Sequence, residues 1–267
     1  MKLTDIITKE IPMLSKNRTL LDALESLNKG DLESIAICDE KRPVGTLSYR
    51  DILFRIGAQR LRAVSPASLY VSGFVKDFPA TLSNDTSIRR AAKLMLELSS
   101  NALPMFYDET FLGLVFRRNM LQLVRDSTAT VSSLMRRNFR TIHPHERVIQ
   151  ARMLMLENDI SLLPVLSEED HILGIVTEKE ILNDLIEFQK HVPEKNQKAR
   201  IRQLPVSTAM KVSVPTVESE QPLSDAVQKM MKDQLPGLIV TESSKIVGTV
   251  SPHEVLEFIV GSFPQEQ

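Results

Sequence analysis

Residues 172–182 read ILGIVTEKEIL, and three other stretches of the chain repeat this pattern. They are PVGTLSYRDIL at 43–53, FLGLVFRRNML at 111–121 and IVGTVSPHEVL at 246–256. An alanine precedes the glycine of each stretch by 22 or 23 residues; the pairs are Ala23 and Gly45, Ala91 and Gly113, Ala151 and Gly174, and Ala226 and Gly248. A spacing that recurs four times indicates an internal repeat of four copies.

Each copy predicts a strand, a helix, a β-hairpin and a second helix. Apolar residues lie three positions before and four positions after each alanine, which is the spacing of one face of a helix. Two apolar runs that flank four or five polar residues then predict a hairpin. A second amphipathic segment closes the copy, for example Tyr49–Ile56 or Glu178–Phe188. The leading extended segments are Ile11–Leu14, Phe78–Leu82, Phe139–Ile142 and Val214–Val217.

The predicted fold class is therefore α+β (α/β), built from four strand-helix-strand-strand-helix units. A single unit would leave apolar surface uncovered, so we expect the units to assemble as two pseudo-twofold pairs. The expected units span residues 1–58, 72–127, 128–189 and 204–262, and the pairs form two modules at 1–127 and 128–267.

Composition excludes several classes of protein. The 33 basic and 34 acidic residues give a net charge of −1, so a general attraction to nucleic acid is not expected. One cysteine, Cys38, rules out an internal disulfide framework and reads as a small core residue. The nine glycines form neither a GxGxxG nor a P-loop motif. Neither an apolar membrane span nor a signal peptide is evident, which predicts a soluble, cytoplasmic protein without a membrane partner.

On these features the repeat resembles the CBS domains, named for cystathionine β-synthase, which occur in tandem pairs called Bateman modules. The resemblance rests on openings such as Ser132-Ser133-Leu134-Met135, on the run Leu162-Leu163-Pro164-Val165-Leu166 and on the G-h-h-[ST]-x-x-[DE] endings. It covers nearly the whole chain as four copies. This layout is similar to the gamma subunit of AMP-activated protein kinase and to stand-alone prokaryotic CBS proteins. The resemblance implies a regulatory module whose ligand is AMP, ADP, ATP or S-adenosylmethionine and which requires no cofactor.

In this family the hydroxyl of the [ST]-x-x-D element contacts ribose or phosphate, and the acid hydrogen-bonds the ribose hydroxyls. The resemblance therefore implies three ligand-binding pairs: Ser48 with Asp51, Thr177 with Glu180, and Ser251 with Glu254. A helix N-terminus at the same place would favour a phosphate group. Copy two has Phe116 and Asn119 at these positions, so it is the weakest candidate to contact a ribose.

The same pairs have a purely structural interpretation. A Ser or Thr followed by Glu at a helix start forms a capping box, in which each side chain bonds the other residue's backbone amide. For Thr177 and Glu180, and for Ser251 and Glu254, capping alone and ligand contact are both open. For Ser48 and Asp51 we favour ligand contact, because the shorter Asp is a poorer partner for a capping box.

Basic residues supply candidates for a phosphate contact. Arg117 and Arg118 open the last helix of copy two, and an arginine fork suits phosphate. Since paired helix starts face one shared cleft, we expect these arginines to reach a nucleotide whose ribose copy one holds. His143 and His145 lack a further ligand for a metal site, and His253 is expected to be exposed.

The favoured function is a non-enzymatic sensor that binds an adenosyl nucleotide in clefts between paired repeats. The alternative is a ligand-free scaffold, in which the four repeats oligomerise or hold a partner protein. A homo-oligomer or a partner protein is expected in either case. An enzyme is disfavoured, because the repeats use up the chain and no nucleophile–base pair, catalytic residue or metal set is left over.

Overall fold

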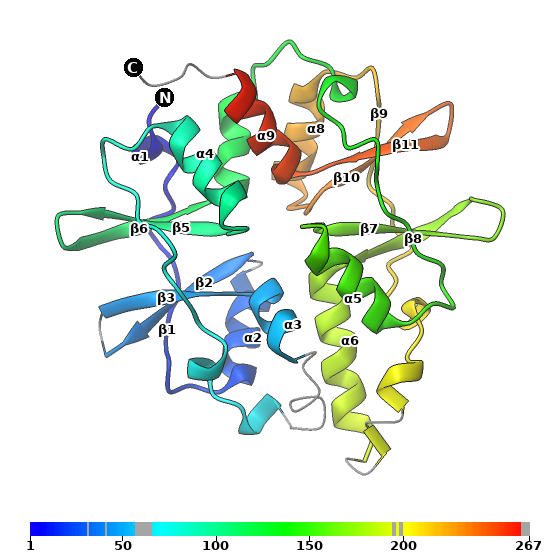
Figure 1. Cartoon of the computed structure of the whole chain (residues 1–267), viewed down its shortest axis with the longest axis horizontal. Helices are drawn as coiled ribbons and strands as arrows, with labels where there is room; N and C mark the ends of the chain where they lie inside the picture. Colours follow the sequence, from blue (N-terminus) through cyan, green and yellow to red (C-terminus); the bar gives the residue numbers. More distant parts are fainter. Residues whose placement is uncertain (31, 41, 57–65, 194–195, 198–199, 263–267) are drawn as a thin grey trace.

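The computed structural model describes residues 1–30, 32–40, 42–56, 66–193, 196–197 and 200–262. In these residues the chain forms four α+β units that surround a common centre (Figure 1). Their hairpins lie along the left and right of the view, and most of the helices lie between them. The predicted fold class is confirmed.

Each unit places a helix, a β-hairpin and a final helix in the same order. The first unit contains α1 (Leu3–Ile6), β1 (Met13–Ser15), α2 (Leu20–Gly30), β2 (Ser34–Asp39), β3 (Arg42–Ser48) and α3 (Tyr49–Ile56). The second contains the 3₁₀ turns η1 (Pro66–Ser68) and η2 (Val71–Gly73), then β4 (Lys76–Asp77), α4 (Ile88–Glu97), β5 (Ala102–Tyr107), β6 (Thr110–Phe116) and the 3₁₀ helix η3 (Arg117–Val124). The third contains η4 (Val131–Ser133), α5 (Val148–Glu157), β7 (Leu162–Leu166), β8 (Ile172–Thr177) and α6 (Glu178–His191). The fourth contains η5 (Ile201–Gln203), η6 (Val206–Thr208), β9 (Thr216–Glu218), α8 (Leu223–Lys232), β10 (Leu238–Glu242), β11 (Lys245–Val250) and α9 (Pro252–Ser262).

The repeat alanines lie on the buried faces of α2, α4, α5 and α8. All four are fully buried, as are Met95, Met155 and Met230 four positions further on in three of the copies. The predicted apolar face of these helices is confirmed.

The leading strands differ in length between the units. β1 pairs parallel with β2, and β9 pairs parallel with β10. In the second and third units the expected strands Phe78–Leu82 and Phe139–Ile142 each shrink to one parallel bridge, from Leu82 to Met105 and from Ile142 to Val165. The partner strands explain the difference. Ala36 and Ile239 donate their backbone N–H to the leading strands of the first and fourth units, whereas Pro104 in β5 and Pro164 in β7 stand at the equivalent positions and have no N–H to donate.

The segment that precedes the first helix of each unit pairs with the hairpin of the partner unit. β4 pairs antiparallel with β3, and Thr8 forms a bridge with Leu114 in β6. In the other pair, Lys211 bridges Ile175 and Arg136 bridges Thr249. These reciprocal contacts relate units one and two, and units three and four, by a pseudo-twofold exchange.

The repeat glycines lie where these exchanged segments cross the hairpins. A Cβ atom at Gly174 would lie closer than 3.0 Å to the carbonyl oxygen of Lys211, and one at Gly113 would clash likewise with Thr8. Gly113 also has a φ of +148°, which side chains rarely adopt. The glycines that register the repeat in the sequence are therefore positions of close backbone approach.

The buried cores join the units in a second direction. One large core combines buried residues of the first and third units, including Ile52 and Ile181, and another combines those of the second and fourth, including Met95 and Ile259. Smaller clusters lie between the hairpins within each pair. Within each pair, the two units thus contact each other through their sheets. The two pairs contact each other through helices, such as α4 against α9 (Figure 1).

The last helix of the second unit departs from the other three. Residues 117–124 form a 3₁₀ helix rather than an α-helix, and Phe116 brings no side-chain oxygen to its start. Cys38 is buried at 7% exposure, as expected for a small core residue. None of the helices in the described part of the chain combines the length and apolar character needed to cross a membrane.

Candidate functional site

The three hydroxyl–acid pairs all close on themselves at helix starts. Ser48 and Ser251 each donate both a backbone amide and a hydroxyl hydrogen bond to the acid three residues on, Asp51 or Glu254, over 2.5–2.9 Å. Thr177 likewise donates its hydroxyl to Glu180. The expectation that Asp51 is a poor capping partner is wrong, since its carboxylate reaches both groups of Ser48. Burial raises the pKa of Asp51, against the hydrogen bonds from Ser48.

A cluster of charged side chains lies where the starts of the four last helices meet. Three cationic or ionisable groups from different units converge on Asp159 of the third unit: Arg50 at 3.0 Å, Arg117 at 2.9 Å and His253 at 2.9 Å. Arg50 also pairs with Glu178 at 2.7 Å. All five side chains are buried to 15% exposure or less. The expectation that His253 is exposed is wrong, because its imidazole is held by Asp159.

The two acids of this cluster have opposite pKa shifts. Burial opposes ionisation of Asp159, but the hydrogen bond from His253 and the charges of Arg117 and Arg50 outweigh it, so the pKa of this carboxyl lies below its ordinary value. Burial raises the pKa of Glu178 to about 7, against the lowering effect of Arg50. Asp159 is therefore the fixed negative charge of the cluster, whereas the raised pKa of Glu178 favours its protonated form relative to an ordinary glutamate.

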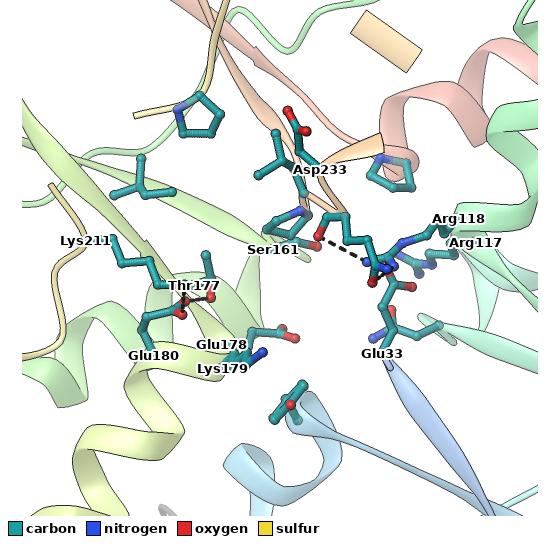
Figure 2. Close-up of a pocket in the computed structure, with 18 of the residues that line it drawn as sticks. Glu33, Arg117, Arg118, Ser161, Thr177, Glu178, Lys179, Glu180, Lys211 and Asp233 are labelled. Carbon is teal, nitrogen blue, oxygen red and sulfur yellow. Dashed lines mark hydrogen bonds and ion pairs between the residues drawn. The ribbon is translucent and has the colours of Figure 1, made fainter. Parts of the chain in front are cut away.

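A cavity of about 750 Å³ opens beside this cluster (Figure 2). Thr177, Glu180 and Lys211 lie on one side of it and Glu33, Arg117 and Arg118 lie opposite. Glu180 is largely buried at 11% exposure and pairs with Lys211 over 2.5 Å. All four units contribute to the lining; further contributors are Leu32, Tyr49, Asn101, Ser161, Ile175, Lys179, Val214, Pro215, Lys229, Asp233, Gln234, Leu235, Pro236, Pro252 and His253.

The two arginines lie beside a different pair than the sequence predicts. Arg117 and Arg118 line the cavity that contains Thr177 and Glu180 of the third unit, not one that contains Ser48 and Asp51. The reason is that the second unit packs its helix start against the other pair of units. Arg117 is 5% exposed and donates to the backbone of Ser100 and Met95, whereas Arg118 reaches Glu33 and Gln234.

The other two hydroxyl–acid pairs border different hollows. Asp51 borders a hollow of about 610 Å³ whose walls include Phe54, Phe74, Lys76 and Met153. The hollow at Ser251 and Glu254 is only about 20 Å³, and Arg136, which pairs with Glu254 over 2.8 Å, lines it. The structure therefore brings the predicted site residues to three separate places.

One group of side chains has the composition of a metal site. Ligand atoms of His253, Glu254 and Glu257 lie within 4.8 Å of one another. Glu254 is already bonded to Ser251 and Arg136, however, and His253 is bonded to Asp159. We therefore assign these side chains to the helix start and the central cluster.

Arg50, Asp159 and Glu178 of the central cluster are not among the predicted site residues, although the repeat contains a signal for two of them. The residue five positions after each repeat glycine is basic in every copy: it is Arg50 in copy one, and Arg118, Lys179 and His253 in the others. Eight positions after the repeat alanine, copies two, three and four have Ser99, Asp159 and Gln234, and all three residues have a positive φ of 45–51°. This left-handed turn after the first helix directs Asp159 to the centre.

Comparison with known proteins agrees with this architecture. The family model "CBS domain" matches residues 3–58, 131–187 and 201–261, more than half of the chain. Residues 59–130, which include the divergent Phe116 and Asn119, lie outside the matches.

Similar proteins occur in archaea. An uncharacterized 33.4 kDa protein of Thermofilum pendens is 24% identical over 96% of this chain and 91% of its own length. The uncharacterized protein MJ1404 of Methanocaldococcus jannaschii is 23% identical over 96% of this chain, which spans 61% of that protein. Protein MJ1225 of the same organism, a proposed archaeal homolog of g-AMPK, superimposes with a TM-score of 0.83 at 18% identity, covering 97% of this chain and 100% of that one. The chain therefore belongs to the CBS-domain family, whose model matches three of its four units.

Proposed function

We propose that this protein is a regulatory sensor that binds an adenosyl ligand (AMP, ADP, ATP or S-adenosylmethionine) in the cavity shared by all four units. The observation that supports this most is the cavity itself, about 750 Å³ beside the α6 helix start that carries Thr177 and Glu180. Its size lies within the range of small-molecule sites, which are usually few in a protein.

The cavity offers suitable groups for a ribose. An ionised carboxylate is a strong acceptor for two neighbouring hydroxyls, and Glu180 presents one at the wall. Thr177 and Lys211 already orient this carboxylate, so a ribose would meet an acceptor in a fixed position. These contacts also mean that capping and ligand binding are compatible roles for one Glu side chain.

The cavity also offers groups for a phosphate. Arg118 lies on the wall opposite Glu180, Lys179 and Lys229 also line the cavity, and the N-terminus of the 14-residue helix α6 opens onto it beside Glu180. The apolar faces of Leu32, Tyr49, Val214 and Pro215 suit a purine ring, since such sites are mostly apolar with a few placed polar groups.

A ligand in this position would report its presence through the packing of the units. It would contact all four units at once and would therefore favour the arrangement in which they close around it. A ligand shifts such an equilibrium only by its difference in affinity between two states. We expect the response to act on a partner protein or a second copy of the chain, without a catalytic step.

The hollow at Asp51 is the candidate for a second adenosyl ligand. Asp51 and Lys76 border it, and Phe54 and Phe74 provide apolar surface. An Asp51→Ala variant is expected to lose whatever adenosyl ligand binds there. Unchanged affinity at every site of that variant would show that Asp51 only caps α3.

The scaffold remains the alternative, because one observation favours it. The three hydroxyl–acid pairs are satisfied internally, and the central cations already have carboxylate partners. A protein with filled binding groups could serve purely to hold a partner.

Thermal unfolding with AMP, ADP, ATP, S-adenosylmethionine and NAD separates these two functions. Any ligand that binds only the folded chain must raise its melting temperature, by about 2.7 kcal/mol of stabilisation at a hundredfold excess over Kd. The sensor predicts a shift with at least one adenosyl ligand, and no shift with any of them favours the scaffold.

Two variants of helix α6 localise the effect. Glu180→Gln should abolish the ligand-induced shift, because it removes the charged acceptor in the cavity. Glu187→Gln makes the same change on the same helix, at an exposed side chain that pairs with Lys190 outside the cavity, and should keep the shift. Equal shifts in the two variants would remove Glu180 from the site.

A further inference from the structure

Arg118 and Glu33 form an ion pair in the wall of the cavity. The guanidinium Nε lies 3.1 Å from the Glu33 carboxylate, and the side chains are 24% and 23% exposed. Arg118 belongs to the second unit and Glu33 to the first, and both line the cavity. Figure 2 shows the pair on the side opposite Thr177 and Glu180.

Glu33 is unusual among the residues at its position in the repeat. Ten positions after each repeat alanine stand Glu33, Asn101, Ser161 and Pro236, and all four line the cavity. Only Glu33 carries a charge. The repeat geometry therefore places a carboxylate in the wall at a point where the other copies have neutral residues.

Arg118 is also the central arginine whose contacts a ligand can replace most easily. Arg50 and Arg117 are 11% and 5% exposed, and both are held by the buried Asp159. The other contacts of Arg118, to the side-chain and backbone oxygens of Gln234, are long at 3.3 and 3.4 Å. Glu33 thus supplies its closest charged contact, and an anion entering the cavity can replace that carboxylate.

We propose that Glu33 determines how strongly the cavity prefers phosphorylated over unphosphorylated adenosyl ligands, by occupying Arg118 until a phosphate displaces it. This inference rests on the proposed function and identifies the phosphate as the part of the ligand that Arg118 recognises. A guanidinium binds a phosphate through two parallel hydrogen bonds, so phosphate is a strong competitor for Arg118. The displaced Glu33 carboxylate remains beside the phosphate and repels it. A ligand without phosphate leaves the Arg118–Glu33 ion pair intact, so its affinity does not depend on Glu33.

Titration calorimetry with AMP and adenosine tests this inference, because the two ligands differ only in the phosphate. Glu33→Gln should raise the affinity for AMP about fivefold, which corresponds to about 1 kcal/mol for a partly exposed charge pair, and leave the affinity for adenosine unchanged. Arg118→Gln should weaken AMP and leave adenosine unchanged. In the Arg118→Gln background the Glu33→Gln change should no longer strengthen AMP binding.

Asp233→Asn is the matched control, since Asp233 lines the same cavity but makes no contact with Arg118 that would compete with phosphate. Equal gains in AMP affinity for Glu33→Gln and Asp233→Asn would show a general charge effect and overturn the inference. Parallel changes in AMP and adenosine would overturn it as well. If none of the variants binds AMP, the inference fails. Binding of another adenosyl ligand in the cavity would still support the proposed function in that case.

Discussion

At the scale of single residues, Gly174 shows why the repeat is visible in the sequence. Its α-carbon faces the backbone of the exchanged segment at Lys211, which leaves no space for a methyl group. Gly174→Ala should therefore lower the free energy of unfolding by about 1–3 kcal/mol, as overpacked positions do. Urea denaturation measures this change.

Gly73→Ala is the control for that experiment, because nothing lies within 4 Å of a Cβ atom at Gly73. It should change stability by less than about 0.5 kcal/mol. If the two alanine variants were equally stable, the close crossing at Gly174 would not be the reason for its glycine.

The Asp159 side chain pairs with basic groups of the three other units. Asp159→Asn keeps the shape and tolerates the left-handed backbone at φ 50°, but it leaves Arg50, Arg117 and His253 without their shared anion. We expect a loss of about 3 kcal/mol in the free energy of unfolding, as for other broken buried ion pairs. Asp170→Asn, at an exposed left-handed turn with φ 61°, should be nearly neutral by the same chemical-denaturation measurement. A neutral Asp159→Asn would contradict the role of the cluster.

At the scale of elements, the sequence predicts the helices and hairpins well because their apolar spacing repeats four times. It does not predict the 3₁₀ form of residues 117–124, which pack against α8 and α9 of another unit. It does not predict the two single-bridge strands either, where Pro104 and Pro164 of the partner strand offer no backbone donor. The same holds for the site. The capping pairs are visible in one short motif, whereas the meeting of Arg118 with Glu180 across one cavity depends on how the pairs of units pack.

The helix starts also make stability depend on pH through Glu178, the first residue of α6. Its pKa is raised from 4.5 to about 7 in the fold, so the folded chain binds more protons than the unfolded chain between these values. The contribution of Glu178 to stability is thus full below about pH 4.5 and is lost as the pH rises through 7. Arg50, Arg117, Asp159 and Asp51 are the charged groups that act on it.

Glu178→Gln removes this titration and leaves the other groups in place. The difference in unfolding free energy between the variant and the wild type should therefore grow in favour of the variant from pH 5 to pH 7.5. Urea unfolding at a series of pH values measures the difference. A difference that is independent of pH would show that Glu178 titrates near its ordinary pKa.

At the scale of the whole molecule, the two modules proposed at residues 1–127 and 128–267 share their cores. Buried residues of units one and three form one core, and those of units two and four form another. Neither module buries these faces alone, so we expect both to unfold together. Differential scanning calorimetry should give one transition with equal calorimetric and van't Hoff enthalpies. Two separate transitions would show that the modules are independent.

The sequence predicts that units pair, because one unit alone leaves apolar surface exposed. It does not reveal that the helices of one pair cover those of the other, which creates the central cluster and the shared cavity. Residues as far apart as Glu33, Arg118, Thr177 and Gln234 therefore meet in one site. Such contacts depend on packing between pairs, and short motifs carry no record of them.

The most direct measurement is a crystal structure of the protein grown with the adenosyl ligand that raises its melting temperature most. We expect difference density for that ligand in the cavity shared by the four units, with its ribose hydroxyls within hydrogen-bond distance of Glu180 and its charged end towards Arg118. An empty cavity, with the ligand bound elsewhere on the molecule, would show that this cavity is not the adenosyl site.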